Sequence, residues 1–375
     1  MKFRKFLQTL FKKTFQFLFK LLYGTIKLNN LENLKNVKKN KITNIKSDIP
    51  NSKDYYSYKI FNGRVYTDYI ENVAIISENN LINEISYQQV SGNLVDASQN
   101  IVLKNGTPRI KKKFKGRVLC VLQGASGNNY SHWILEILPK IKMYSEHYSL
   151  DDLDYIYLPK IDIFQKETLS ALGINENKFI SSEKYRHIEA DELIVVDHTY
   201  YYKGTILEQN KNQPTWVIEW LRRTFLNCEK KFDCQKFFFI DRSDSKYKHN
   251  QIQNTIEVSN YLKKNKFVSY KLESLSFFEK IYLFKNADII IGLHGAGFVN
   301  TVFCKPGTKI IEIRSFLYSN TVYEKISNIN NLNYHLIQTE TLKESERING
   351  DINLPLDKLD IILNEDGSYT LPPVY

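Results

Sequence analysis

The stretch of residues 286–313, NADIIIGLHGAGFVNTVFCKPGTKIIEI, constrains the fold more than any other part of the chain. Its apolar run Asp288–Ile291 predicts a buried parallel strand, and the turn His294–Gly297 predicts entry into a helix at Phe298–Phe303. A second turn leads to another predicted strand, Lys309–Ile313. A strand, a glycine turn, a helix and a strand in this order are typical of a parallel α/β sheet.

The glycine turn lies at the carboxyl end of a predicted strand, where such sheets bind ligands. Gly295 and Gly297 let backbone N–H groups approach a phosphate at the positive end of a helix, and His294 can donate to a diphosphate or a sugar hydroxyl. Glu312 is a lone acid in the next strand, for which a ribose diol is a suitable partner. Two alternatives stay open. The glycines could serve only to permit the turn, and Glu312 could pair with a buried lysine or a backbone N–H.

Chain length and cysteine usage set broader limits. With 375 residues, the chain exceeds the usual size of one hydrophobic core, so we expect two domains. The four cysteines show no zinc-type spacing, and no signal-peptide cleavage pattern is present. We therefore expect a reduced, cytoplasmic setting.

The positive charge is concentrated at the N-terminus. The net charge is +11, but residues 1–50 contain twelve Lys/Arg and two acids, so the other 325 residues contain 40 basic and 39 acidic side chains. A nucleic-acid enzyme would carry its basic surface on the folded body. The distribution therefore argues against a nucleic-acid partner.

Residues 1–24 have the pattern of a basic amphipathic helix. On a helical wheel, Phe3, Phe6, Leu7, Leu10, Phe11, Phe15, Phe17, Leu18, Leu21 and Leu22 fall on one half, opposite Lys2, Lys5, Lys12, Lys13 and Lys20. Lysines keep every apolar run well short of the ~20 residues that a membrane span needs. We expect a helix on an anionic membrane surface, on the inner face of the cell membrane, with residues 25–52 as a linker. The alternative is a helix that docks on the protein's own core or into a groove of a partner chain.

Residues 53–205 predict a first α/β domain with an acceptor-side site. A strand around residues 117–122 runs into a polar loop that contains Ser126 and Asn129, and Ser131 is suited to cap the following helix. On that helix His132 and Glu136 share one face until Pro139 disturbs it. Without further information, an ordinary capped helix start with a surface pair is the favoured interpretation.

Residues 206–338 predict a second α/β domain, followed by a tail at 339–375 that we expect to return to the first domain. A strand at 236–240 ends at Arg242, and the loop beyond it contains Lys246 and Lys248. Two α/β halves place the two candidate sites on facing strand ends. A cleft between them would hold a nucleotide-linked substrate.

Four segments together resemble glycosyltransferase family 61. They are SHWILEILPKI (131–141), RSD (242–244), Asn254 and LESLSFFEKIYLFKNADIIIGLHGAGFVNTVFCKPGTKIIEI (272–313). The ordered combination is far more specific than any one of the motifs. The resemblance covers residues 124–313, about half of the chain.

The resemblance implies a GT-B-like α/β fold, with two Rossmann-like domains facing a central cleft. It implies inverting transfer of a hexosyl or pentosyl group from a nucleotide sugar, with UDP as the commonest nucleotide, to a hydroxyl of a surface glycan. The acceptor would be a capsule, lipopolysaccharide or lipid-linked glycan. Neither a cofactor nor an essential metal is implied.

Carried over residue by residue, the resemblance places His132 and Glu136 on the acceptor side. It places these residues on the donor side: Arg242, Asn254, His294, Gly295, Ala296, Gly297 and Glu312. Where relatives have several arginines, this chain has Lys246 and Lys248, which become candidate phosphate contacts. Inverting transfer needs a base for the acceptor hydroxyl and positive groups for the leaving diphosphate. We assign His132 as the base, with Glu136 as its orienting partner or as an alternative base.

Two other functions are compatible with the same pattern. A sugar-nucleotide epimerase can use the same fold and donor site, because fold does not determine function. A non-catalytic capsule-assembly module would retain only the donor site. An epimerase does not need an acceptor to act on its nucleotide sugar, and a binding module would not turn it over.

Overall fold

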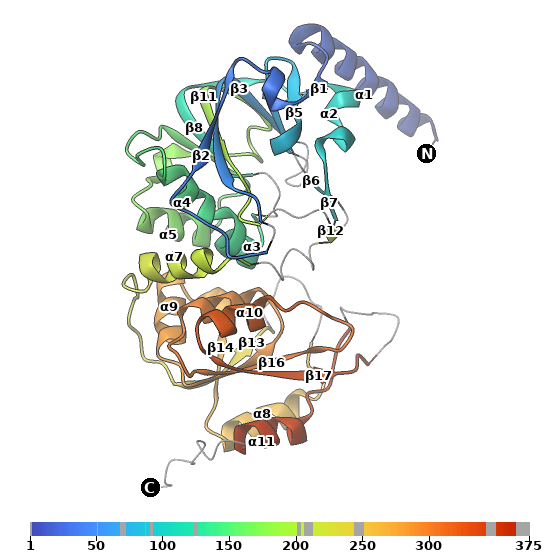
Figure 1. Cartoon of the computed structure of the whole chain (residues 1–375). Coiled ribbons are helices and arrows are strands. Elements are labelled where there is room, and N and C mark those ends of the chain that lie inside the picture. Colours follow the sequence, from blue (N-terminus) through green and yellow to red (C-terminus); the bar gives the residue numbers. More distant parts are fainter. Residues whose placement is uncertain are drawn as a thin grey trace. The chain divides into compact units, whose positions relative to one another are not determined.

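The computed structural model describes residues 2–50, 52–67, 73–86, 88–90, 93–122, 127–200, 204–205, 213–243, 251–342 and 350–364 (Figure 1). The chain divides into two compact units, Met1–Val217 and Ile218–Tyr375. Each is an α/β structure with its own sheet. The division falls inside helix α7 (Thr215–Phe225), later in the chain than the expected boundary at 205/206.

The first unit is built on a nine-stranded sheet in the order β1-β5-β4-β3-β11-β8-β9-β10, with β2 on β3. Strands β11, β8, β9 and β10 are mutually parallel, whereas β2, β4 and β11 run antiparallel to β3. Only the parallel half is therefore Rossmann-like, and the expectation of a fully Rossmann-like domain is corrected to a mixed sheet. The strands are β1 (Lys27–Asn29), β2 (Val37–Ile42), β3 (Tyr55–Thr67), β4 (Val73–Ser77), β5 (Asn80–Ile82), β8 (Lys112–Cys120), β9 (Tyr155–Leu158), β10 (Phe179–Ser181) and β11 (His187–Val196).

Residues 27–29 and 37–42 are strands of this sheet, so the predicted linker at 25–52 is wrong for these residues. Strand β2 pairs with β3 over six residues, and β1 pairs with β5. The segment has few large apolar side chains, but Ile26, Ile42, Ile45 and Ile49 are all buried. Backbone pairing and these few isoleucines hold it in place, which composition alone did not indicate.

Short helices complete the first unit. Asp162 and Gln165 form a capping box that starts α5, and α4 packs on β11. A small sheet pairs β12 (Gly204–Thr205), β7 (Asn93–Val95) and β6 (Gln88–Val90). The helices are α1 (Lys2–Tyr23), α2 (Val102–Asn105), α3 (Tyr130–His132), the π-helical turn η4 (Trp133–Ile137), α4 (Pro139–Ser145), α5 (Ile163–Ala171) and the 3₁₀ turns η1 (Leu31–Asn33), η2 (Asn83–Ile85), η3 (Ala97–Gln99) and η5 (Glu176–Lys178).

The second unit is the parallel α/β domain that the sequence predicts. Its five-stranded sheet has the order β14-β13-β15-β16-β17, with every neighbouring pair parallel. Ser276 and Glu279 form the capping box that starts α9. The helix expected at 298–303 is a 3₁₀ helix that begins at Ala296. The elements are β13 (Phe237–Asp241), α8 (Thr255–Lys264), β14 (Val268–Lys271), η6 (Leu272–Ser274), α9 (Phe277–Lys285), β15 (Ile289–Leu293), η7 (Ala296–Phe303), β16 (Lys309–Ser315), α10 (Val322–Ile329), β17 (Asn333–Thr339) and α11 (Leu356–Asn364).

The described part of the C-terminal segment, residues 339–342 and 350–364, packs on this second unit. Ile352 bridges to Ile252 and Thr341, and α11 places Leu359 and Leu363 in the same core as β15 and β16. The expectation that the tail returns to the first domain is therefore wrong for these residues. Burial of their apolar side chains on the nearest sheet accounts for the difference.

Candidate active site

The first unit presents a histidine at the start of an irregular helix. Asn129 caps it by accepting from the N–H groups of Ser131 and His132, at 2.9 and 3.3 Å. The cap is therefore Asn129 and not Ser131, because a side chain two or three residues ahead of the free N–H groups reaches them. After His132 the helix widens into the π turn η4, closed by a bond of 2.8 Å from Leu138 N to Trp133 O. Pro139 follows directly, and such π turns are frequent at functional sites.

We call His132, Glu136, His198 and Tyr200 the His132 cluster. His132 Nδ1 lies 2.5 Å from Glu136 Oε1, and the Tyr200 hydroxyl donates to the same oxygen at 2.6 Å. His198 Nε2 lies 3.5 Å from the other carboxylate oxygen, Oε2. Glu136 is buried, whereas the His132 side chain is 21% exposed. Because Nδ1–H is held by the carboxylate, Nε2 of His132 is the nitrogen left to accept a proton.

The surroundings control the charge of this pair. Burial opposes the imidazolium form of His132, but the charge and hydrogen bond of Glu136 outweigh it and raise the pKa of His132. Burial would raise the pKa of Glu136. The nearby His132 and His198 outweigh this effect and hold the pKa of this carboxyl well below its usual range. Burial also lowers the pKa of the nearby Lys140 to about 8. The cluster thus keeps Glu136 ionised beside a histidine whose pKa it raises.

The predicted pair of His132 and Glu136 is brought together as expected. His198 and Tyr200 were not predicted, since they lie 62 and 64 residues beyond Glu136 in the chain. Their only signal in the sequence is the apolar run at 193–196 just before them, because polar residues gather at the carboxyl ends of strands in a parallel sheet. The predicted loop residue Ser126 lies outside the described residues.

The second unit gathers its polar residues at the carboxyl ends of three adjacent strands. Arg242 follows β13, His294 follows β15, and the Arg242 Nη1 donates to His294 O at 2.5 Å. The guanidinium lies over Gly295, where an added Cβ would be 3.0 Å from Arg242 Cζ. Burial lowers the pKa of Arg242 from its ordinary value, which is too high for the group to lose its charge. A side chain at position 295 would crowd the guanidinium, so the glycine gives this cation room to approach the backbone.

Glu312 bonds to His294 and Tyr334, and its predicted ribose contact stays a prediction. One carboxylate oxygen bonds to His294 Nδ1, and the other accepts from the Tyr334 hydroxyl at 2.7 Å. Glu312 has no solvent exposure, so its oxygens face protein groups. We call His294, Glu312 and Tyr334 the His294 cluster. A lone acid in a strand indeed has partners, but they are a histidine and a tyrosine.

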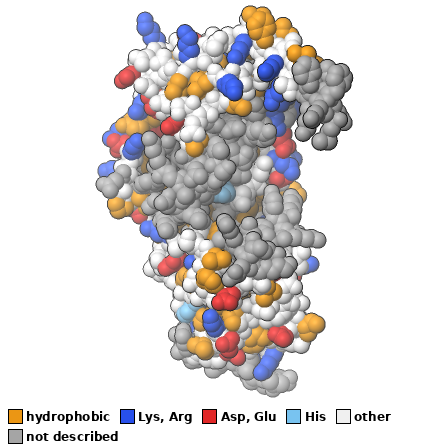
Figure 2. All heavy atoms as spheres, turned by 90° about the vertical axis from the view of Figure 1, so that its right-hand side faces the viewer, with side chains coloured by type: hydrophobic (Ala, Val, Ile, Leu, Met, Phe, Trp, Pro, Cys, Tyr) orange, Lys and Arg blue, Asp and Glu red, His pale blue; other side chains and the backbone are white. Residues whose placement is uncertain are grey.

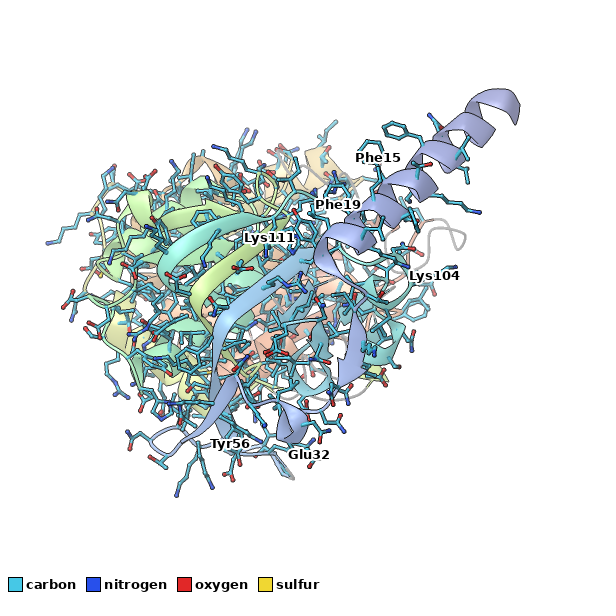
Figure 3. All side chains as sticks on the ribbon, turned by 90° about the horizontal axis from the view of Figure 1, so that it is seen from above. Phe15, Phe19, Glu32, Tyr56, Lys104 and Lys111 are labelled. Carbon is cyan, nitrogen blue, oxygen red and sulfur yellow. The ribbon has the colours of Figure 1, made fainter. Side chains whose placement is uncertain are left out.

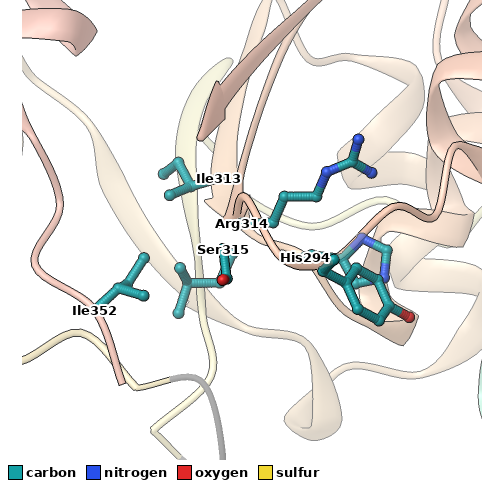
Figure 4. Close-up of a pocket in the computed structure, with 7 residues that line it drawn as sticks. His294, Ile313, Arg314, Ser315 and Ile352 are labelled. Atoms are coloured by element: carbon teal, nitrogen blue, oxygen red, sulfur yellow. The ribbon is translucent and has the colours of Figure 1, made fainter. Parts of the chain in front are cut away.

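The His294 side chain lines a pocket together with Arg314, Ser315 and Tyr318 (Figure 4). The ring centroids of His294 and Tyr318 are 4.5 Å apart, and Tyr323 donates to Gly295 O at 2.8 Å. Arg314 was not singled out in the sequence, although it follows Glu312 by two residues on the same strand. That spacing places the two side chains on one face of the strand and was the available signal.

The other predicted donor residues have different positions. Ala296 and Gly297 open the 3₁₀ helix η7 behind His294. The Asn254 amide bonds through both its oxygen and its nitrogen to the Leu354 backbone, at 2.9 and 3.0 Å, so these contacts hold the C-terminal segment. Donor contact by Asn254 stays a prediction. Lys246 and Lys248 lie outside the described residues.

No group of three or more His, Cys, Asp or Glu side chains that could hold a metal ion occurs among the described residues. Independence from metals stays a prediction, which chelation will test.

Comparison with known proteins places this geometry in a family. Residues 130–311, just under half of the chain, match the family model of glycosyltransferase 61. The chain carries a glycosyltransferase 61 domain. A curated relative, the beta-1,2-xylosyltransferase RCN11 of Oryza sativa subsp. japonica, is 37% identical over 59 residues. That alignment covers 16% of this chain and 11% of the rice protein.

The glycosyltransferase 61 match contains the whole His132 cluster but only His294 of the His294 cluster. It begins at Tyr130, two residues before His132, and it ends at Ile311, one residue before Glu312. It therefore runs through both compact units. The match does not specify the sugar or the acceptor.

Proposed function

We propose that this protein is an inverting glycosyltransferase that moves a sugar from a nucleotide sugar to a hydroxyl of a surface glycan. The observation that supports this proposal best is the His132 cluster, which lies within the matched family segment. A histidine with Nδ1 on an ionised, buried carboxylate and Nε2 unoccupied by that contact is the arrangement of a general base. The helix-start pair thereby gains a chemical role.

In the proposed reaction, Nε2 of His132 takes the proton of the acceptor hydroxyl. The acceptor oxygen forms its bond to the anomeric carbon from the face opposite the leaving group, and the bond from that carbon to the diphosphate oxygen breaks. Glu136 stays ionised and stabilises the imidazolium that forms. The nucleoside diphosphate leaves with both electrons of the broken bond, and the configuration at the anomeric carbon is inverted.

The leaving diphosphate requires positive charge in the second unit. Arg242 is suited to supply it, since its charge is permanent and it already lies at the strand ends beside His294. His294 offers a ring nitrogen on a side chain that is 13% exposed. We propose UDP as the nucleotide and a capsule, lipopolysaccharide or lipid-linked glycan as the acceptor. No metal is required in this scheme, because the cationic side chains stabilise the charge.

The decisive experiment is a nucleotide-sugar panel. The donor should raise the thermal stability of the protein, and the nucleoside diphosphate should be released only when an acceptor glycan is added. The new linkage, examined by NMR, should have the opposite anomeric configuration to the donor, and EDTA should leave the rate unchanged. Conversion of the nucleotide sugar without an acceptor would identify an epimerase instead. Binding without turnover on a broad acceptor panel would identify a binding module.

Helix α1 supports a second part of the proposal, attachment to an anionic membrane surface. Among the described residues, no helix is long and apolar enough to cross a membrane. Large apolar side chains of α1 nevertheless face solvent, and Lys12 and Lys13 are exposed as well. Figure 2 shows hydrophobic and basic side chains close together at the top of one face. The exposed apolar residues are Leu10, Phe11, Phe15, Phe17, Leu18, Leu21 and Leu22. Apolar and cationic groups on one exposed helix match the chemistry of an anionic lipid surface.

The last turn of α1 is fixed to the first unit. Lys20 Nζ donates to Lys104 O at 2.6 Å, and the Tyr23 hydroxyl accepts from Lys111 N at 3.1 Å. Phe19 lies at this end, near Lys104 and Lys111, whereas Phe15 is further out along the helix (Figure 3). The helix is thus joined to the sheet directly and would hold the first unit at a defined angle to a membrane.

Vesicle binding tests this attachment. Replacing Phe11, Phe17, Leu18 and Leu21 by Gln should abolish binding to phosphatidylglycerol vesicles and leave turnover of a soluble acceptor intact. The double change Lys12→Gln and Lys13→Gln is the matched control: it should weaken binding and flatten its salt dependence. Unchanged vesicle binding by the four-residue variant would contradict the proposal. A change in oligomeric state alone would instead assign α1 to a protein groove.

A further inference from the structure

Arg314 is a buried cation near the carboxyl end of β16. The residue is 6% exposed and lines the same pocket as His294 (Figure 4). It follows Glu312 by two residues, so both side chains leave the strand on one face. The residue thus belongs to the neighbourhood of the His294 cluster.

The guanidinium of Arg314 is not satisfied by the part of the chain that the structure describes. Its Nε and Nη1 atoms are buried and have no hydrogen-bond partner there. Glu312 Oε1 lies 3.9 Å from Nη1, which is too far for a hydrogen bond, and this oxygen already bonds to His294. Burying a charged donor without a partner destabilises a protein, so a group in this state indicates a ligand that completes its hydrogen bonds.

Arg314 and Arg242 act on the same small region. Burial raises the pKa of the Tyr318 hydroxyl, and both guanidinium groups work against this effect. Both charges are therefore within electrostatic reach of one hydroxyl group. The strand order explains why: β13 and β16 both neighbour β15, so their carboxyl ends are about 10 Å apart, twice the spacing between strands.

We propose that Arg314, together with Arg242, binds the diphosphate of the donor. This inference rests on the proposed function and deepens it. The carboxylate nearest to Arg314, Glu312, already has both oxygens bound to His294 and Tyr334, and Glu273 acts on Arg242 by its charge alone. The diphosphate of a nucleotide sugar carries two negative charges, one for each guanidinium group. Two guanidinium groups on either side of β15 suit a group with two phosphorus centres.

The competing role for Arg314 is structural, as an internal ion pair with Glu312. The two roles predict opposite effects on the free protein. An ion pair that supports the fold would make Arg314→Gln less stable. A buried cation that binds a ligand lowers the stability of the protein while the ligand is absent. Arg314→Gln should then leave the melting temperature of the free protein unchanged or raise it.

The experiment compares Arg314→Gln and Arg314→Lys with Lys305→Gln. Lys305 pairs with Asp288 and is half exposed, so its replacement removes one positive charge from the same unit without touching the pocket. The probes are inorganic diphosphate, the nucleoside diphosphate that stabilises the wild type best, and its nucleoside. We expect Arg314→Gln to weaken binding of both diphosphates roughly 10–100-fold and binding of the nucleoside less than about threefold. Arg314→Lys should retain part of the affinity, and Lys305→Gln all of it.

Three results overturn the inference. Wild-type affinity of Arg314→Gln for the diphosphates would show that the residue does not bind them. Equal losses for nucleoside and nucleoside diphosphate, or a melting temperature several degrees lower without ligand, would assign Arg314 to the fold. Failure of the wild type to bind any nucleoside diphosphate would contradict the proposed function itself, and would thus be distinguished from failure of Arg314 alone.

Discussion

Each of the two units holds a histidine whose Nδ1 is bound to a buried glutamate, with a tyrosine hydroxyl on the same carboxylate. In the His132 cluster the tyrosine bond is 2.6 Å long, and in the His294 cluster it is 2.7 Å. Both glutamates are almost fully buried, and both histidines are partly exposed. The shared arrangement fixes the ring orientation and leaves Nε2 of each histidine for chemistry outside the pair.

The surroundings distinguish the two clusters. The His132 cluster adds a second histidine, His198, whose pKa burial lowers. The His294 cluster is accompanied by two guanidinium groups, those of Arg242 and Arg314. A histidine that titrates beside one carboxylate suits proton transfer, whereas a histidine among permanent cations suits an anion. We therefore propose that the same side chains serve two different purposes and that the neighbouring charges distinguish them.

The largest expected effect separates the clusters by the step that each controls. His132→Ala should lower kcat roughly 10²–10⁴-fold, the range of a positioned base, while affinity for the nucleoside diphosphate stays near the wild type. Steady-state kinetics and calorimetry on the same preparation measure both quantities. Near-normal kcat in this variant, with Glu136→Gln inactive, would transfer the base role to Glu136.

The next effect concerns the His294 cluster. His294→Ala should weaken binding of the nucleoside diphosphate roughly 10–100-fold, with a smaller change of kcat at saturating donor. Glu312→Gln should act in the same direction through His294 and should leave nucleoside affinity unchanged. If Glu312→Gln weakens nucleoside and nucleoside diphosphate equally, the ribose contact predicted from the sequence is right and the supporting role is wrong.

A pH profile sharpens the comparison further. Glu136 raises the pKa of His132, and burial alone would lower it. In Glu136→Gln the acidic limb of the kcat profile should therefore move to lower pH, because the histidine loses its proton at lower pH. The rate at the plateau should fall about tenfold, since the neutral amide stabilises the imidazolium less. An acidic limb that stays in place would show that another group controls it.

The smallest effects come from the two tyrosines. Tyr200→Phe and Tyr334→Phe each remove one hydrogen bond to a buried carboxylate, and each should lower the free energy of unfolding by about 1–2 kcal/mol. Tyr200→Phe should also reduce kcat a few-fold, while Tyr334→Phe should change donor affinity instead. Denaturant titration and kinetics check the pair. The same kinetic change in both variants would remove the functional distinction between the clusters.

Local spacing was enough to predict part of this site. His132 and Glu136 are four residues apart, so the helical period alone brings them to one face, and the π turn does not separate them. The alternation of apolar runs and glycine turns likewise predicted β13, β15 and β16 and located Arg242 and His294 at strand ends. These features depend on neighbours within a few residues, which a sequence displays directly.

Other parts depended on the tertiary structure. Residues 25–52 read as a linker, yet β1 and β2 find their pairing partners in β5 and β3. The sequence suggested a ribose as the partner of Glu312. In the structure its hydrogen-bond partners are His294 and Tyr334, which lie at or on the two strands that flank β16. Neither composition nor the helical and strand periodicity of a sequence shows which distant residues will pair. The order and register of strands decide which distant side chains meet, and burial then decides which of them carry charge.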